Sequence, residues 1–180
     1  MKKIYVLLLT GVLFLSSCSW AGLHTKFFLE NDGPAAKKTF EQVLEAIQAQ
    51  DTEALRKMFS KAALSEAENM DERVTSLIEF FQGKVLSIDD WGGPSASESI
   101  LYGEKTKELR STFDVETSER KYRFALKEVT VDTANKDNVG IHSIYIKQVK
   151  DGENLMSAYW GDGKWTPGIN IEPKDDISNQ

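Results

Sequence analysis

The chain has 180 residues and a single cysteine, and its 28 acidic against 22 basic side chains give a formal net charge of −6 at pH 7. An acidic surface is repelled by the phosphates of nucleic acids, so the composition argues against a nucleic-acid partner. One cysteine excludes a disulfide within the chain, and one cysteine with two histidines disfavours a zinc site.

Residues 1–17 have the pattern of a secretory signal peptide. Lys2 and Lys3 precede an apolar run over residues 4–15. This run is too short to cross a bilayer as a helix, for which about 20 residues are needed, whereas a short apolar stretch behind basic residues is typical of a cleaved signal. Its removal takes away two basic residues and no acidic one, which leaves a net charge of −8.

The residues that end this segment, Leu15, Ser16, Ser17 and Cys18, resemble a bacterial lipobox. The resemblance implies cleavage before Cys18, which then carries a diacylglyceryl thioether and fatty acyl chains such as palmitate. Two or more acyl chains hold a protein stably on a bilayer. We therefore expect a lipoprotein on the extracytoplasmic face of the cell membrane, with Cys18 as its lipidation site and the lipid as its membrane contact.

Composition divides the rest into a tether over residues 18–33, one domain over residues 34–172 and a polar tail over residues 173–180. The tether contains apolar residues such as Trp20 and Phe27, where a flexible linker would be rich in Gly, Ser and charge. Two alternatives stay open. The tether docks on the domain or near the lipid headgroups, or it is a plain spacer with incidental aromatic residues.

Three helices are predicted at the start of the domain. The apolar stripe of the first, over residues 34–50, consists of Phe40, Val43, Leu44 and Ile47. Asp51 is placed to cap a second, short helix. A third helix is predicted from Asn69, with Glu72 as its capping-box partner, to Gly83.

The second half alternates apolar and polar residues, as strands do. Strands are predicted over residues 85–91, 109–115, 122–131, 139–146 and 155–160. A change of apolar phase predicts a bulge near Lys127 and Glu128. Along residues 139–146, alternation assigns Val139, Ile141, Ser143 and Tyr145 to one face and His142, Ile144 and Ile146 to the other. Helices followed by strands predict an α+β domain with helices packed on one face of a curved antiparallel sheet.

Residues 40–60 resemble the opening helix pair of the nuclear-transport-factor-two-like, or cystatin-like, superfamily: a helix ending in a polar residue and Asp, then a short helix of the Glu-Ala-Leu-x-x-x-Phe type. With the lipobox and residues 165–169, the chain is similar to small uncharacterised lipoproteins of Gram-positive gut bacteria. The resemblance implies a cone-shaped fold. Proteins of that fold include ketosteroid isomerase-like enzymes, dehydratases and binding modules without activity, so the fold alone assigns no function.

No motif specifies a reaction, a metal or a cofactor. Asp89 and Asp90 are adjacent on a strand, so their side chains point to opposite faces. Either carboxyl would gain basicity if it faced an apolar pocket. The pocket candidates are Asp89, Asp90, Trp91, His142, Tyr145 and Trp160. In the alternative interpretation, Phe113, Tyr122 and Tyr145 fill the core and His142 is a solvated strand residue.

Three functional hypotheses follow. The preferred one is a non-catalytic module, displayed at the membrane surface, that binds an unknown small molecule or protein partner. The alternative is an isomerase- or dehydratase-like enzyme that acts on a small apolar molecule, with Asp89 or Asp90 working beside His142 or Tyr145. The third is a structural subunit that forms a homodimer through the sheet face.

Overall fold

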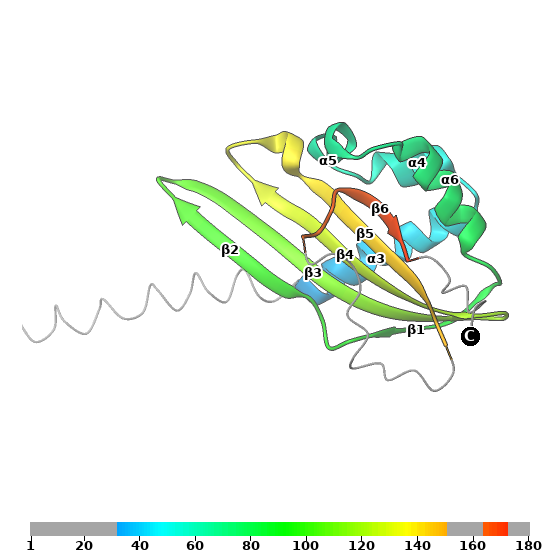
Figure 1. Cartoon of the computed structure of the whole chain (residues 1–180). Coiled ribbons are helices and arrows are strands. Elements are labelled where there is room, and N and C mark those ends of the chain that lie inside the picture. Colours follow the sequence, from blue (N-terminus) through cyan, green and yellow to red (C-terminus); the bar gives the residue numbers. More distant parts are fainter. Residues whose placement is uncertain (1–31, 151–163, 173–180) are drawn as a thin grey trace, which may run out of the picture.

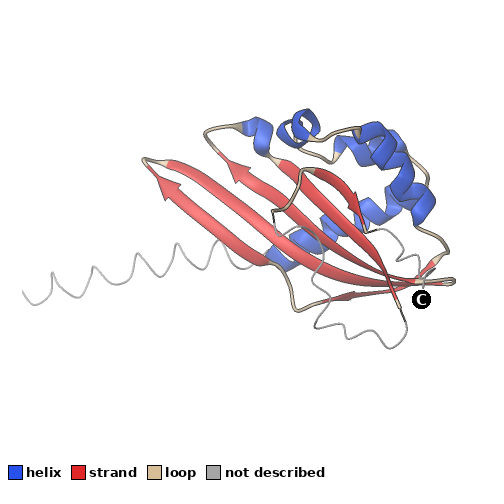
Figure 2. Cartoon of the chain, viewed as in Figure 1, coloured by secondary structure: helices blue, strands red, loops and turns tan. Residues whose placement is uncertain are grey.

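The structure is a computed structural model that describes residues 32–150 and 164–172. Within these ranges the chain is α+β, with four α-helices and a six-stranded sheet (Figures 1 and 2). The helices are α3 (Asp32–Gln48), α4 (Thr52–Lys57), α5 (Lys61–Glu66) and α6 (Met70–Phe80). The strands are β1 (Val85–Asp90), β2 (Ser95–Leu101), β3 (Glu104–Thr117), β4 (Lys121–Asp132), β5 (Gly140–Val149) and β6 (Gly168–Ile171). Cys18, the signal, the tether up to residue 31, Trp160, the strand predicted over residues 155–160 and the polar tail lie outside the described residues. The last two residues of the predicted tether, Asp32 and Gly33, belong to α3.

The helices α3, α4 and α6 correspond to the three that periodicity predicts. Asp51 caps α4 as expected, because its carboxylate accepts a hydrogen bond from the Ala54 backbone N–H at 2.8 Å. The cap predicted for α6 is wrong: Asn69 is left-handed with φ 52° and its side chain caps nothing. The short helix α5 was not predicted, and Ser60 caps it through Ala63 N–H.

The sheet has the order β1-β3-β4-β5-β6, with β2 also paired to β3. All described pairs of strands are antiparallel except β5 and β6, which are parallel. The expectation of a purely antiparallel sheet is therefore wrong, and the sheet is mixed. Parallel neighbours need a connection of a dozen residues or more, and 18 residues separate the end of β5 from the start of β6 in the sequence.

A β-bulge lies where β4 and β5 lose regular register. Lys127 pairs with Ser143 and Glu128 pairs with Ile141, so His142 is an extra residue on β5. The bulge predicted near Lys127 and Glu128 is confirmed. The predicted faces hold for residues 143–146, where Ile144 and Ile146 are in the core and Ser143 and Tyr145 lie on the other face. They are wrong before the bulge, because the extra residue changes the alternation and Ile141 is buried in the core with Ile144.

The core lies between the helices and one face of the sheet, which we call the helix face. Phe40 of α3 stacks on Phe113 of β3 with ring centroids 4.1 Å apart and meets Phe124 of β4 edge-on at 5.1 Å. Tyr122 is fully buried beside them and donates its hydroxyl proton to the Phe80 carbonyl at 3.0 Å. Phe113 and Tyr122 thus fill the core, as the alternative interpretation of the aromatic residues expected.

Candidate functional site

A polar cleft of about 350 Å³ lies between α5 and the strands β2 to β5. Its strand residues belong largely to the sheet face opposite the helix face, which we call the outer face: Ser97, Glu108 and Val129 are direct cross-strand neighbours there. The cleft is lined by Ser60, Ala62, Glu66, Ser97, Thr106, Lys107, Glu108, Lys127, Val129, Asp132, Asn138 and His142. The bulge brings His142 to this place, beside the end of β4.

Glu108 is the most strongly paired acid of the cleft. Its carboxylate receives Lys127 Nζ at 3.0 Å and Arg110 Nη2 at 2.7 Å. Burial by itself would raise the pKa of Glu108, but the hydrogen bonds and charges of Lys127 and Arg110 outweigh it and lower the pKa below its ordinary value. Glu108 is therefore an ionised hydrogen-bond acceptor at neutral pH.

One tautomer of His142 satisfies every hydrogen bond around Ser143. Ser143 Oγ donates its single proton to the Trp165 carbonyl at 2.9 Å, and His142 Nδ1 lies 2.7 Å from the same oxygen. With the Ser143 proton on the Trp165 carbonyl, both contacts are hydrogen bonds only when His142 carries its proton on Nδ1, which leaves Nε2 as an acceptor in the neutral ring. Burial and the positive charge of Lys127 lower the pKa of His142, although Glu66 and Glu108 act in the opposite sense.

This chemistry suits binding more than covalent catalysis. Ser143 is fully buried and its hydroxyl proton is held by a backbone carbonyl, so His142 does not activate it as a nucleophile. The cleft instead offers a neutral imidazole acceptor at His142, an ammonium at Lys127 and a carboxylate at Glu108. Hydroxyl or ammonium groups of a ligand can donate to the imidazole and the carboxylate, while its hydroxyl oxygens accept from the ammonium.

The sequence-predicted acids lie elsewhere on the sheet. Asp89 pairs with Asp114 and Asp90 pairs with Phe113, which confirms that they face opposite sides, and both are exposed on β1. Strand β1 is separated from β5 by β3 and β4, a lateral distance of about 14 Å at the usual strand spacing. The register therefore does not bring either acid together with His142 or Tyr145.

Trp91 covers a buried ion pair on the outer face. Its ring lies over the Arg123 guanidinium, 3.9 Å from Cζ to the ring centroid, and its Nε1–H donates to Asp114 at 3.0 Å. Arg123 is 1 % exposed and makes two 2.7 Å bonds to the same carboxylate. The side chain of Trp91 thus shields a bidentate pair from water and does not enter the polar cleft.

Tyr145 is also occupied within the fold. It is buried on the outer face, its hydroxyl accepts the Thr166 backbone N–H at 2.7 Å, and its ring meets Trp165 edge-on at 5.6 Å. Of the pocket candidates in the described ranges, only His142 lines the cleft. Glu108 and Lys127 were missed. The predicted bulge was an available signal for Lys127, whereas no sequence pattern marked Glu108.

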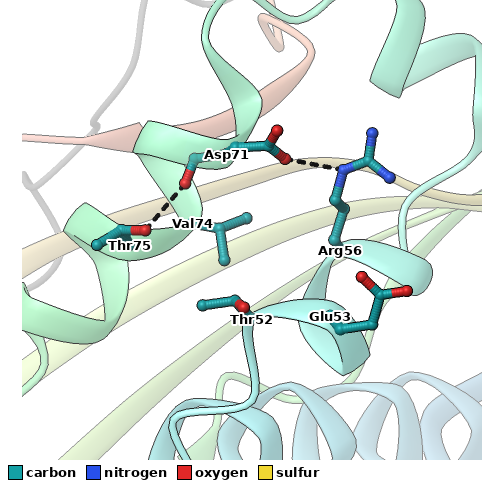
Figure 3. A pocket seen from close by; sticks show the side chains of 6 residues that line it. All are labelled: Thr52, Glu53, Arg56, Asp71, Val74 and Thr75. Carbon is teal, nitrogen blue, oxygen red and sulfur yellow. Dashed lines mark hydrogen bonds and ion pairs between the residues drawn. The ribbon is translucent and has the colours of Figure 1, made fainter.

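A second hollow, of about 410 Å³, lies between α4 and α6 (Figure 3). Arg56 reaches from α4 to Asp71 on α6, with Nε and Oδ1 2.9 Å apart, while Thr52 and Thr75 line its sides. Both charged side chains are largely exposed, so solvent screens the pair. The absence of a buried polar group at this hollow makes it the weaker candidate among the described residues.

The chain belongs to the DUF5104 family, a domain of unknown function whose family model matches residues 42–151. The matched segment runs from within α3 to just past β5 and contains Glu108, Lys127 and His142 of the cleft. No curated protein matches the sequence.

Two kinds of feature are absent from residues 32–150 and 164–172. No helix there is long and apolar enough to cross a membrane. No group of three or more His, Cys, Asp and Glu side chains in the same ranges is placed to hold a metal ion.

Proposed function

We propose that the protein is an exported lipoprotein, anchored through Cys18 at the extracytoplasmic face of the membrane, whose DUF5104 domain binds a small polar ligand in the polar cleft. The lipobox-like residues and the signal-like segment before them support the anchor. The cleft supports the binding role because it combines an ionised carboxylate, an ammonium and a neutral imidazole around about 350 Å³ of space.

The single observation that carries the binding role is the bulge at His142. A bulge costs regular pairing, and such features recur beside functional sites, where they redirect a side chain. Here it brings the His142 imidazole into the cleft that Glu108 and Lys127 also line, and the ion pair of these two residues is 3.0 Å long. A protein partner that inserts a polar side chain would use the same groups.

We also propose that the domain belongs to the nuclear-transport-factor-two-like superfamily, as the helix pair over residues 40–60 suggests. The order of helices followed by strands is compatible with that proposal. The enzymatic alternative that pairs Asp89 or Asp90 with His142 is disfavoured, because two strands separate their positions. A homodimer through the sheet face stays a prediction, which light scattering on the Cys18→Ser chain tests.

The anchor is tested in bacteria that process lipoproteins. With an alkyne fatty acid in the medium, the natural chain should take up label and sediment with membranes. Cys18→Ser should lose the label and appear intact in the soluble fraction. Ser17→Ala, which keeps a small residue before the cleavage site, is the matched control and should behave as the natural chain does. A labelled Cys18→Ser chain would contradict the anchor.

The cleft is tested by thermal-shift screening of the Cys18→Ser chain against amino acids, sugars and polyamines. A ligand of the cleft should raise the melting temperature of this chain, and His142→Ala and Lys127→Ala should each weaken that ligand at least tenfold. Arg56→Ala, which alters the hollow of Figure 3, is the control and should leave the affinity unchanged. Loss of binding in Arg56→Ala alone would move the site to the helices and overturn the assignment.

A further inference from the structure

The hairpin that joins β2 to β3 ends in exposed apolar side chains. Ile100 is 66 % exposed, Leu101 is 63 % exposed and Tyr102 is 98 % exposed. We call residues 100–103 the hairpin tip. Isolated apolar residues on a surface are ordinary, but three in succession on a projecting turn form a patch that nothing in the described fold covers.

The turn itself disfavours tyrosine. Tyr102 and Gly103 both have positive φ, 53° and 88°, between the paired residues Leu101 and Glu104. A two-residue hairpin of this kind normally carries Asn-Gly or Asp-Gly, because other side chains crowd the backbone in the left-handed region. Neither packing nor backbone preference explains an aromatic ring there, so a contact outside the domain is the reason that remains.

The tip projects from the end of the domain at which the described chain begins. Asp32, the first residue of α3, forms an ion pair with Lys107 at 2.6 Å, and Lys107 also pairs with Glu98 across the hairpin at 2.9 Å. Figure 1 shows β2 and β3 extending beyond the start of α3 at this end. The tip lies only a few residues along β3 from Lys107, about 10–15 Å at the usual strand rise.

The segment between Cys18 and the domain is long enough for the hairpin tip to reach a membrane in which Cys18 is anchored. Fourteen residue steps separate Cys18 from Asp32, which span at most about 50 Å when fully extended. We propose that the hairpin tip inserts its apolar side chains into the headgroup region of the bilayer that holds the anchor. This inference rests on the proposed lipoprotein anchor, and it fixes which end of the domain faces the membrane.

The chemistry of the tip favours lipid over a charged partner. Tyrosine is enriched at membrane interfaces, where its ring is buried and its hydroxyl stays in contact with water. The mature chain carries a net charge of −8, so anionic headgroups repel it as a whole. The contact should therefore depend on apolar insertion and should form on neutral phosphatidylcholine without any anionic lipid.

The test replaces the natural anchor with a histidine tag, so that it does not depend on lipidation. The Cys18→Ser chain from residue 18 on, tagged at its N-terminus, is bound to phosphatidylcholine vesicles that contain a nickel-chelating lipid. Because the chain then has no cysteine, Glu104→Cys places one nitrobenzoxadiazole label beside the tip and leaves the three apolar residues in place. Glu119→Cys, exposed in the turn at the other end of β3, is the matched control.

Spin-labelled lipid should reduce the emission at position 104 at least twofold and leave position 119 unchanged. Replacing the tip by Ile100→Ser, Leu101→Ser and Tyr102→Asn together should abolish the difference, with circular dichroism unchanged. Equal quenching at the two positions would overturn the proposal. So would a blue shift at position 104 that appears without vesicles and grows with protein concentration, because the tip would then contact a second chain. Failure of the Cys18 labelling experiment alone leaves this result intact, so the two proposals fail separately.

Discussion

Replacing Tyr102 with asparagine should stabilise the domain, although it removes an aromatic side chain. The left-handed conformation costs a residue with a Cβ roughly 1–2 kcal/mol, and asparagine tolerates it far better than tyrosine. Tyr102 is 98 % exposed. Loss of a side chain of roughly 200 Å² therefore forfeits only about 0.1 kcal/mol of burial. The net gain should be about 1 kcal/mol, or roughly 3 °C in melting temperature for a domain of this size.

The assay is thermal and urea unfolding of the Cys18→Ser chain, followed by circular dichroism. Tyr102→Phe is the control, because it keeps the Cβ and the ring and should change stability by no more than a few tenths of a kcal/mol. The same Tyr102→Asn substitution should weaken the contact of the hairpin tip with phosphatidylcholine. A variant that is more stable and binds lipid less is the expected signature of a residue kept for function.

A lower melting temperature in Tyr102→Asn would refute this reasoning. It would mean that the ring makes stabilising contacts within the chain. If the melting temperature is the same in Tyr102→Asn, in Tyr102→Phe and in the natural chain, the turn holds tyrosine without strain. The backbone argument for an external contact would then fail.

Three further predictions concern the domain interior and are measured by denaturant unfolding. Phe113→Ala should cost about 3–5 kcal/mol, because it removes a buried ring stacked on Phe40, and a loss below 1 kcal/mol would contradict the packing. Gly140→Ala should cost roughly 2 kcal/mol or more, since φ is 127° and an added Cβ would lie 2.8 Å from the Ser60 backbone nitrogen; an unchanged midpoint would contradict that approach. Burial raises the pKa of Glu128, with Asp32 adding to the rise and a Thr39 hydrogen bond opposing it, so the folded state loses stability as pH rises above the ordinary value of 4.5. Glu128→Gln should therefore be more stable than the natural chain at pH 8 and lose that advantage toward pH 4, and a constant difference across this range would exclude the titration.

Periodicity predicted the elements that bury one regular stripe. Helix α3 follows from Phe40, Val43, Leu44 and Ile47, all of which are buried. The strand β2 was missed for the opposite reason: every residue from Ser95 to Leu101 is exposed, so no alternation marks it. Helix α5 is too short for a recognisable stripe, and β6 has only four residues.

The candidate site was harder to predict than the fold. A pair of adjacent acids drew attention to Asp89 and Asp90, yet register places them at the far side of the sheet from His142. The phase change at Lys127 did locate the bulge. Sequence alone could not say that the extra residue lies on β5, because either partner strand can carry it. That choice decides which side chains line the cleft.

The arrangement of short strands around β3 and β5 has a consequence for self-association. One edge of β3 is shared by β1 and β2, and β5 is paired by β6 over one part and, at Ile141, by Phe59 over another. Long strands with open edges recruit other chains and polymerise, whereas short, interrupted ones do not. Along the edge of β3, the chain between β1 and β2 is interrupted by Gly92, Gly93 and Pro94, so these two strands do not form one continuous strand. Many copies of the domain can therefore crowd on one surface without growing into a continuous sheet.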